Sequence, residues 1–183
     1  MTTFPEQRSV ILTGAASPRG IGRATAHFLA ERGWSVGIID LDESAAQAVA
    51  AEVAETHGVS AAGAGANVAD EQQVRAAFDA LEPQLPQLVA LVNLAGVSSA
   101  DPYLEVTPDE WNRVIGVNLN GVHYATRRAV ETTETGRPVA LADVIEAARV
   151  RAIEAEPDAA VRAALQRSTV ATESRRTEPH ASF

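Results

Sequence analysis

Three glycines stand in a short stretch that can hold a phosphate group. The stretch runs from Thr13 to Gly22 and reads Thr-Gly-Ala-Ala-Ser-Pro-Arg-Gly-Ile-Gly. It follows the apolar run 9–12 and precedes a helical pattern, so it predicts a turn from a strand into a helix. Such a turn aims backbone N–H groups and the positive end of the helix dipole at an anion, here a pyrophosphate. The residues expected around that anion are Gly14, Ser17, Arg19, Gly20, Ile21 and Gly22.

An acid follows at the distance that a dinucleotide site needs. Asp40 ends the second apolar run, 34–39, and lies 20 residues beyond Gly20. A carboxylate there can accept hydrogen bonds from the hydroxyls of an adenosine ribose, and it repels a 2′-phosphate, so the pattern favours NAD over NADP. Two plainer interpretations stay open. Asp40 can be a cap at a strand–helix junction, and a glycine turn alone can simply begin a helix.

The elements that must position these residues alternate between strands and helices up to about residue 130. Apolar runs at 9–12, 34–39, 59–66 and 88–93 predict four strands, and helical patterns lie between them. This alternation favours βαβ units and a parallel sheet. We therefore expect an α/β protein with a Rossmann-like doubly wound parallel sheet of four or five strands.

Helix boundaries carry their own signals. The first helix is expected over 20–32. Asp42 caps the next, which ends near residue 57 at Gly58. Asp70, with Gln73 three residues on, opens another as a variant of the capping box. Thr107 predicts a last helix start, with Pro108 in its first position and Glu110 reaching back to the cap, and that helix runs to about residue 128.

Three further segments follow the turn in order: Asn67-Val68, then Asn93-Leu94-Ala95-Gly96, then Asn118-Leu119-Asn120-Gly121. Together with the glycine turn they resemble the short-chain dehydrogenase/reductase family. The turn is two residues longer than the commonest form of that family, and Leu94 replaces a second asparagine. The resemblance implies a proton-relay role for Asn118 and further cofactor contacts from Leu41, Asn67, Val68, Asn93, Ala95 and Gly96. Turn or packing roles remain open for the three asparagines.

The catalytic tyrosine and lysine of that family have no counterpart in this sequence. Family members transfer a hydride between a nicotinamide and a carbonyl or alcohol, and a tyrosine, a lysine four residues later and a serine handle the proton and the oxygen. All 15 basic residues here are arginine. Tyr124 precedes Arg128 by four residues, but it lies on the helix of Asn118, where the family has an apolar residue. Asn118 is thus the one catalytic position of the family that is kept.

The composition changes after about residue 130. We expect 1–130 to be an NAD(P)-binding segment, 131–167 a divergent helical segment, and 168–183 a disordered tail. Residues 138–141 can form a fifth strand, or Leu141 can begin a helix. The sheet would then be C-terminally incomplete. Three hypotheses follow: an oxidoreductase whose catalytic half is altered, truncated or frame-shifted; a non-catalytic NAD-binding or interaction protein; and a product that does not fold stably.

Composition narrows the remaining classes. The 183 residues contain no cysteine and carry a formal net charge of −9. An acidic chain disfavours a nucleic-acid or anionic-membrane surface. No apolar run approaches the length of a membrane span, and the first eight residues have no signal-peptide core, so we expect a cytoplasmic protein without a metal. If the chain is active, its partner is a small carbonyl or alcohol. Homo-oligomers are common in the family, and the oligomeric state stays open.

Overall fold

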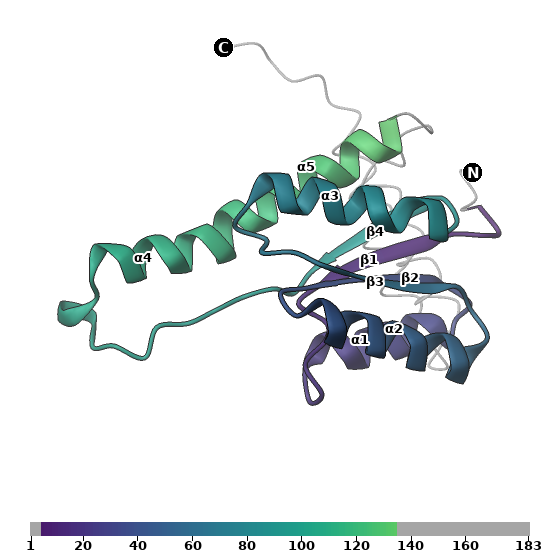
Figure 1. Ribbon diagram of the computed structural model, residues 1–183, viewed down its shortest axis with the longest axis horizontal. Coiled ribbons are helices and arrows are strands. Elements are labelled where there is room, and N and C mark those ends of the chain that lie inside the picture. Colours follow the sequence, from purple (N-terminus) through teal and green to yellow (C-terminus); the bar gives the residue numbers. More distant parts are fainter. Residues whose placement is uncertain (1–4, 135–183) are drawn as a thin grey trace, which may run out of the picture. The chain divides into compact units, whose positions relative to one another are not determined.

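The computed structural model describes residues 5–134, which form a parallel sheet with helices on both faces. The strands are β1 (Ser9–Thr13), β2 (Ser35–Asp40), β3 (Ala61–Gly65) and β4 (Leu88–Asn93), and their order in the sheet is β3-β2-β1-β4 (Figure 1). The chain moves outward from β1 to β3 and then crosses back to β4 on the other side of β1. Ligands of open α/β sheets bind beyond the strand ends at such a switch point.

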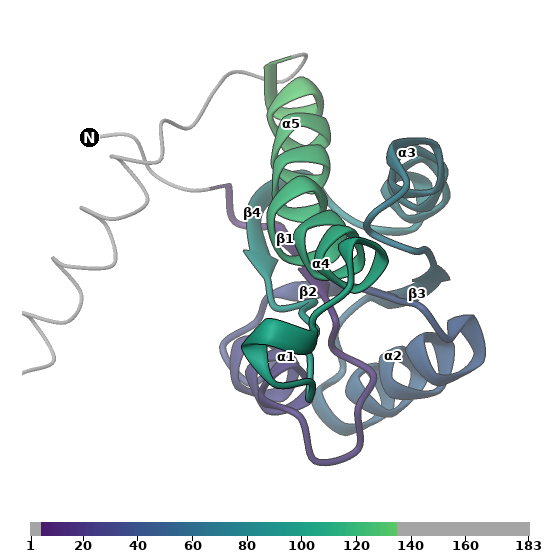
Figure 2. The ribbon, with the colours of Figure 1, turned by 90° about the vertical axis from the view of Figure 1, so that its left-hand side faces the viewer.

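Two pairs of helices cover the sheet. Figure 2 shows α1 (Ile21–Ala30) and α2 (Glu43–His57) on one face, and α3 (Glu71–Leu81) and α5 (Gly121–Glu134) on the other. α4 (Pro108–Ile115) precedes α5 and extends beyond the strand ends (Figure 1). The fold class is therefore the Rossmann-like α/β arrangement predicted from the sequence.

The core consists of two apolar layers, one on each face of the sheet. Val10 and Leu12 of β1 face α1 and α2, whereas Ile11 faces α3 and α5. This alternation follows from the two-residue period of a strand. Many of the helix residues in both layers are alanines, which let the helices approach the sheet closely. A Cβ atom on Gly63 of β3 would lie 2.4 Å from the carbonyl carbon of Ala46 in α2, so α2 packs directly on the strand backbone.

The predicted helix starts are confirmed at Asp42, Asp70 and Thr107, whose side chains accept backbone N–H groups of the first turns of α2, α3 and α4. Gly58 ends α2 with a φ of +67°. The predicted return contact of Glu110 is wrong. Both oxygens of its carboxylate bind Arg113, at 2.7 Å each. A guanidinium fork binds a carboxylate with two charge-assisted bonds, which are stronger than one bond to a neutral N–H.

The predicted helix after residue 107 is interrupted. A π-helical turn over Gly116–Asn120 separates α4 from α5, and α5 continues to Glu134 instead of ending near residue 128. The first four residues of the predicted segment 131–167 belong to α5, whereas the rest of that segment, the segment 168–183 and the predicted fifth strand lie outside the described residues. None of the helices within residues 5–134 combines the length and apolarity that crossing a membrane requires.

Candidate nucleotide-binding site

The glycine turn begins where β1 passes closest to the segment after β4. Gly14 has a φ of +70°, and its N–H donates to the carbonyl of Ile39 at 2.8 Å. A Cβ atom on Gly14 would lie 2.5 Å from the Cα of Ala95. Two requirements therefore select glycine here: a left-handed backbone and a contact that leaves no space for a side chain.

Thr13 holds the end of β1 to the segment that follows β4. The sequence analysis did not assign it this role. Its side chain is buried, and its Oγ1 accepts the N–H groups of Leu94 at 3.2 Å and Ala95 at 3.3 Å. The signal was present as a threonine at the end of a strand next to the glycine. Its partners lie some 80 residues away, however, and no local pattern identifies them.

The turn ends at the N-terminus of α1. The N–H of Gly20 donates to the carbonyl of Ser17 at 3.0 Å, which places Pro18 and Arg19 at the tip of a β-turn. Gly20 is the N-cap of α1 and supplies no side-chain hydrogen bond, so the first N–H groups of this helix have no side-chain cap. A Cβ atom on Gly22 would lie 2.6 Å from the Cα of Ala15, so α1 packs against the turn itself.

Two side chains of the turn region extend into solvent. Ile21 is 78% exposed, and Arg19 is exposed without an ion-pair partner among the described residues. An exposed apolar side chain and an unpaired guanidinium beside an uncapped helix N-terminus can contact an anionic ligand with an apolar portion.

The carboxylate of Asp40 binds both the turn and its own strand end. Its Oδ2 accepts the N–H of Ala16 at 2.8 Å, and its Oδ1 accepts the N–H of Leu41 at 2.8 Å. Each carboxylate oxygen has a second lone pair, so the group retains capacity for two hydroxyl donors. Asp40 is therefore more than a cap at a strand–helix junction, because its side chain reaches the glycine turn.

The three asparagines each make a local or packing contact. Asn67 accepts the N–H of Ala69 at 3.0 Å in an Asx turn, and Asn93 donates to the hydroxyl of Thr126 on α5 at 3.2 Å. Asn118 lies in the π-helical turn. Its amide donates to the carbonyl of Val97 and accepts the N–H of Val97, each at 2.8 Å. Asn118 thus holds the segment after β4 as a neighbouring strand would.

These contacts surround a hollow of about 260 Å³ beyond the carboxyl ends of the strands. Seven predicted cofactor residues line it together with four others that the sequence analysis did not select. The lining consists of Gly14, Asp40, Leu41, Ala66, Asn67, Val68, Leu94, Ala95, Gly96, Val97 and Val117. Of the other predicted residues, Ser17, Arg19, Gly20, Ile21 and Gly22 belong to the glycine turn or the start of α1. Asn93 and Asn118 do not line the hollow; Asn93 instead contacts α5, and Asn118 contacts Val97.

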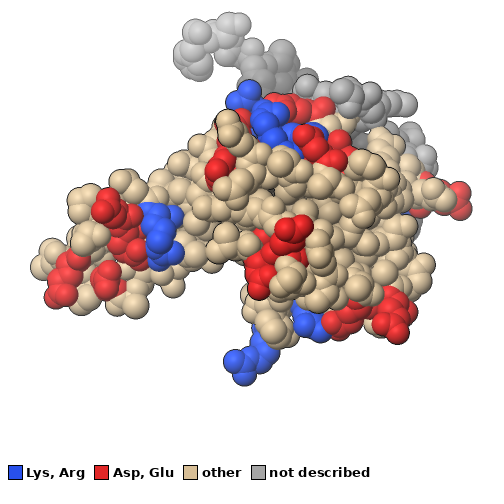
Figure 3. Space-filling view, viewed as in Figure 1, with Lys and Arg blue, Asp and Glu red and all other residues tan. Residues whose placement is uncertain are grey.

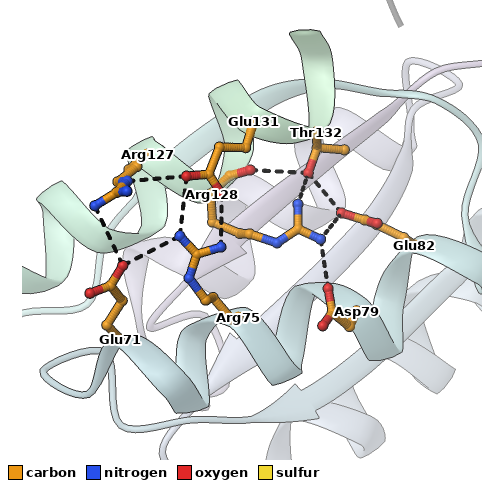
Figure 4. A network of polar contacts seen from close by, with 8 residues as sticks. All are labelled: Glu71, Arg75, Asp79, Glu82, Arg127, Arg128, Glu131 and Thr132. Atoms are coloured by element: carbon orange, nitrogen blue, oxygen red, sulfur yellow. Dashed lines mark hydrogen bonds and ion pairs between the residues drawn. The ribbon is translucent and has the colours of Figure 1, made fainter. Parts of the chain in front are cut away.

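A network of ion pairs between side chains holds α5 against α3. It thereby also holds the π-helical turn that leads into α5. Arg128 is largely buried and binds Asp79 at 2.6 Å and Glu82 at 2.7 Å, while Arg75 binds Glu131 at 2.8 Å (Figure 4). Figure 3 shows the acidic and basic side chains side by side over these helices. The guanidinium of Arg128, the residue four positions after Tyr124, is thus held in ion pairs with Asp79 of α3 and with Glu82 directly after it.

Comparisons with known proteins agree with this geometry. A family model described as enoyl-(acyl carrier protein) reductase matches residues 14–173. A 3-oxoacyl-(acyl-carrier-protein) reductase of Aquifex aeolicus is 35% identical over 120 residues, which are 66% of this chain and 48% of that protein. A D-threitol dehydrogenase of Mycolicibacterium smegmatis is 36% identical over 111 residues, 61% of this chain and 42% of that protein.

Solved structures give the same result. A crystal structure of a 3-ketoacyl-ACP reductase from Sinorhizobium meliloti matches with a TM-score of 0.63 and 35% identity, over 69% of this chain and 49% of that one. The chain belongs to the short-chain dehydrogenase/reductase family, whose members are nicotinamide-dependent oxidoreductases, and it carries the N-terminal portion of that fold. It spans about half the length of the curated relatives it matches.

Proposed function

We propose that residues 5–134 bind NAD(H) and form the cofactor half of an oxidoreductase that acts on a carbonyl or alcohol. The observation that carries this proposal is the hollow between the ends of β1, β2 and β4, with Gly14 on its wall. Gly14 and Gly22 leave the backbone bare where a side chain would collide with Ala95 or Ala15. This bare backbone and the uncapped N-terminus of α1 suit a pyrophosphate.

The adenosine half would lie beside Asp40. Its carboxylate is fixed by two backbone donors and can accept the ribose hydroxyls. Leu41, Asn67 and Val68 line the same hollow and provide mixed apolar and amide surface for the adenine. The nicotinamide supplies the hydride acceptor or donor when the cofactor is bound.

The preference for NAD over NADP rests on negative charge. Asp40, Asp42 and Glu43 all line a second, more open hollow that adjoins the first at Asp40 and Leu41. The hydroxyl of Ser44 and the N–H of Ala45 hold the pKa of Asp42 below its usual value, so this carboxylate stays ionised at neutral pH. A 2′-phosphate placed near Asp40 would meet several like charges.

A second candidate function is cofactor binding without turnover. The observation that favours it is the sequence itself, which contains no lysine and so no Tyr-x-x-x-Lys pair. Asn118 is the one residue in a catalytic position of the family. Its contact with Val97 positions the segment after β4, and it moves no proton by itself. The two functions differ in one measurement, the oxidation of NADH by a carbonyl substrate.

The experiment is a titration of the 183-residue chain with NADH, followed by cofactor fluorescence. NADPH provides the specificity control, Asp40→Ala tests the carboxylate, and Glu55→Ala on the exposed face of α2 is the matched acidic control. Saturable binding that is tighter for NADH and weakened in Asp40→Ala alone would support the proposal. Equal or tighter binding of NADPH would contradict the NAD preference, and no binding of either cofactor would overturn the proposed function.

Turnover is measured separately with NADH and small carbonyl compounds. Turnover would favour the oxidoreductase over the binding protein. Cytoplasmic location and homo-oligomerisation stay predictions, which fractionation and light scattering would test.

A further inference from the structure

Two histidines from different helices meet at the ends of α1 and α2 that lie away from the glycine turn. His27 lies in the last turn of α1, and His57 is the last residue of α2. The Nδ1 atom of His27 and the Nε2 atom of His57 are 3.0 Å apart. Two ring nitrogens at this distance share one hydrogen between them, so at least one of the two presents a lone pair to the other.

A carboxylate fixes which nitrogen of His27 faces its partner. The Nε2 atom of His27 lies 3.3 Å from Oε1 of Glu52, and Glu52 also binds the guanidinium of Arg23. The ion pair with Arg23 marks Glu52 as a carboxylate anion beside the ring. A carboxylate at this distance favours the tautomer of His27 that carries its hydrogen on Nε2, which leaves the lone pair of Nδ1 toward His57.

We propose that His27 and His57 bind a divalent transition-metal ion of the zinc class through these two facing nitrogens. Imidazole nitrogens lie about 2.0–2.1 Å from zinc, so two of them on one tetrahedral ion are roughly 3.3 Å apart. The two nitrogens need to separate by a few tenths of an ångström from their present 3.0 Å, and the rings need to turn so that both lone pairs point at the ion instead of at each other. As the metal enters, the shared hydrogen passes through solvent from Nε2 to Nδ1 of His57, so both rings bind as neutral imidazoles.

The surroundings favour a cation at this position. Both histidines lie in the last turns of their helices, near the negative ends of the two dipoles, and the carboxylate of Glu52, which also pairs with Arg23, lies behind His27. A carboxylate on the far nitrogen of a ligating histidine is the usual outer-shell partner of zinc sites. The side chain of His27 is 27% exposed, so an ion can reach it from solvent.

Water would complete the coordination. Glu52 sits on the far side of His27 and is not a ligand. No group of three or more histidine, cysteine or acidic side chains within residues 5–134 is arranged to hold a metal. With two protein ligands, the site is open and binds more weakly than the closed four-ligand sites of structural zinc.

Calorimetric titration of the full chain, produced without a histidine tag, with zinc chloride tests the proposal. His27→Gln and His57→Gln remove one ligand each, and His123→Gln, an exposed histidine on α5, is the matched control. We expect one ion per chain, abolished in the first two variants and unchanged in the third. Glu52→Gln keeps both ligands and should weaken binding about tenfold.

A second measurement on the unaltered chain removes any dependence on variant folding. Nickel ions added in small amounts should broaden the ring proton signals of His27 and His57 in NMR spectra before those of His123. Three outcomes would each show that the pair is only a hydrogen bond between helices: no zinc binding, zinc binding by the His27 and His57 variants as tight as that of the unaltered chain, or uniform broadening. NADH binding is read in parallel, so failure here and failure of the cofactor site are distinguishable.

Discussion

The carboxylate of Asp40 and the backbone N–H of Ala16 are joined by a hydrogen bond of 2.8 Å, which connects the end of β2 to the glycine turn. The residue expected to select the cofactor by its ribose therefore also shapes the turn expected to hold the phosphates. A substitution at Asp40 changes both properties. The usual interpretation of such a variant, as a change of ribose recognition alone, would be incomplete for this chain.

An NAD analogue without the two adenosine ribose hydroxyls separates the two roles. If Asp40 acts only on those hydroxyls, Asp40→Ala leaves the affinity for the analogue unchanged. We expect instead that Asp40→Ala lowers that affinity about tenfold, the value of one charged hydrogen bond lost from the turn. Fluorescence titration measures it, with Glu55→Ala as the control. An unchanged affinity would limit Asp40 to the ribose.

Substitutions at Gly14 and Gly33 can be compared to test how closely the glycine turn packs against Ala95. Both have positive φ, of +70° and +76°, but a Cβ atom on Gly33 has no neighbour within 4 Å. Gly33→Ala should cost about 1 kcal/mol of unfolding free energy, from the left-handed backbone alone. Gly14→Ala adds a collision with the backbone of Ala95, so we expect at least roughly 3 kcal/mol and loss of NADH binding. Urea unfolding measures both, and equal costs would contradict the contact.

Asn118 and Asn120 offer a similar comparison in the π-helical turn. The side chain of Asn118 makes two hydrogen bonds to Val97, whereas the side chain of Asn120 makes none among residues 5–134. Asn118→Ala should destabilise the chain by roughly 1–2 kcal/mol and increase hydrogen exchange at Val97. Asn120→Ala should leave both unchanged. Val97 exchange that is the same in both variants would show that Asn118 does not hold this segment.

The ion pairs between α3 and α5 make the stability of the fold depend on pH. Arg75, followed by Arg127, holds the pKa of Glu131 below its usual value. A lowered folded-state pKa contributes stability at neutral pH, and that contribution is lost as the pH falls below about 4.5, through the pKa of the unfolded chain and then that of the folded one. The melting temperature of wild type should therefore be higher than that of Glu131→Gln at pH 7. The difference between the two melting temperatures should become smaller toward pH 3. A gap that is constant with pH would assign the effect to packing.

High salt provides a second check on the same ions. Screening weakens exposed ion pairs, so the melting temperature of wild type at pH 7 should approach that of Glu131→Gln as salt is added. Glu55→Gln, whose carboxylate has no ion-pair partner within the described residues, should melt like wild type throughout.

The strands and helix caps could be predicted because their signals are local. Asp42, Asp70 and Thr107 precede helical patterns directly, and each side chain binds an N–H group two or three residues on. The four strands agree with their apolar runs to within two residues at every end. The prediction that Glu110 reaches back to the cap was wrong for a local reason as well, because Arg113 is close enough to bind its carboxylate instead.

Other features depend on residues far apart in the sequence. Thr13 and Ala95, Asp40 and Ala16, and His27 and His57 each meet only after the sheet has formed. The sequence positions of the glycine turn and Asp40 predicted where the hollow lies. They did not predict the hydrogen bond that joins the turn to Asp40. The π-helical turn was missed because a single turn is too short to show a period of its own within a helical pattern.

The number of residues in that π-helical turn sets how the faces of α4 and α5 are rotated relative to each other. The N–H of Gly121 bonds to the carbonyl of Gly116, five residues back, which places one more residue in the turn than an α-helix holds. One residue corresponds to about 100° of rotation. Upstream, Asn118 faces Val97, and downstream Ala125 and Ala129 face the sheet. Deleting a single residue here would restore a regular helix and turn one of these two faces away, so this segment tolerates substitution more readily than a change of length.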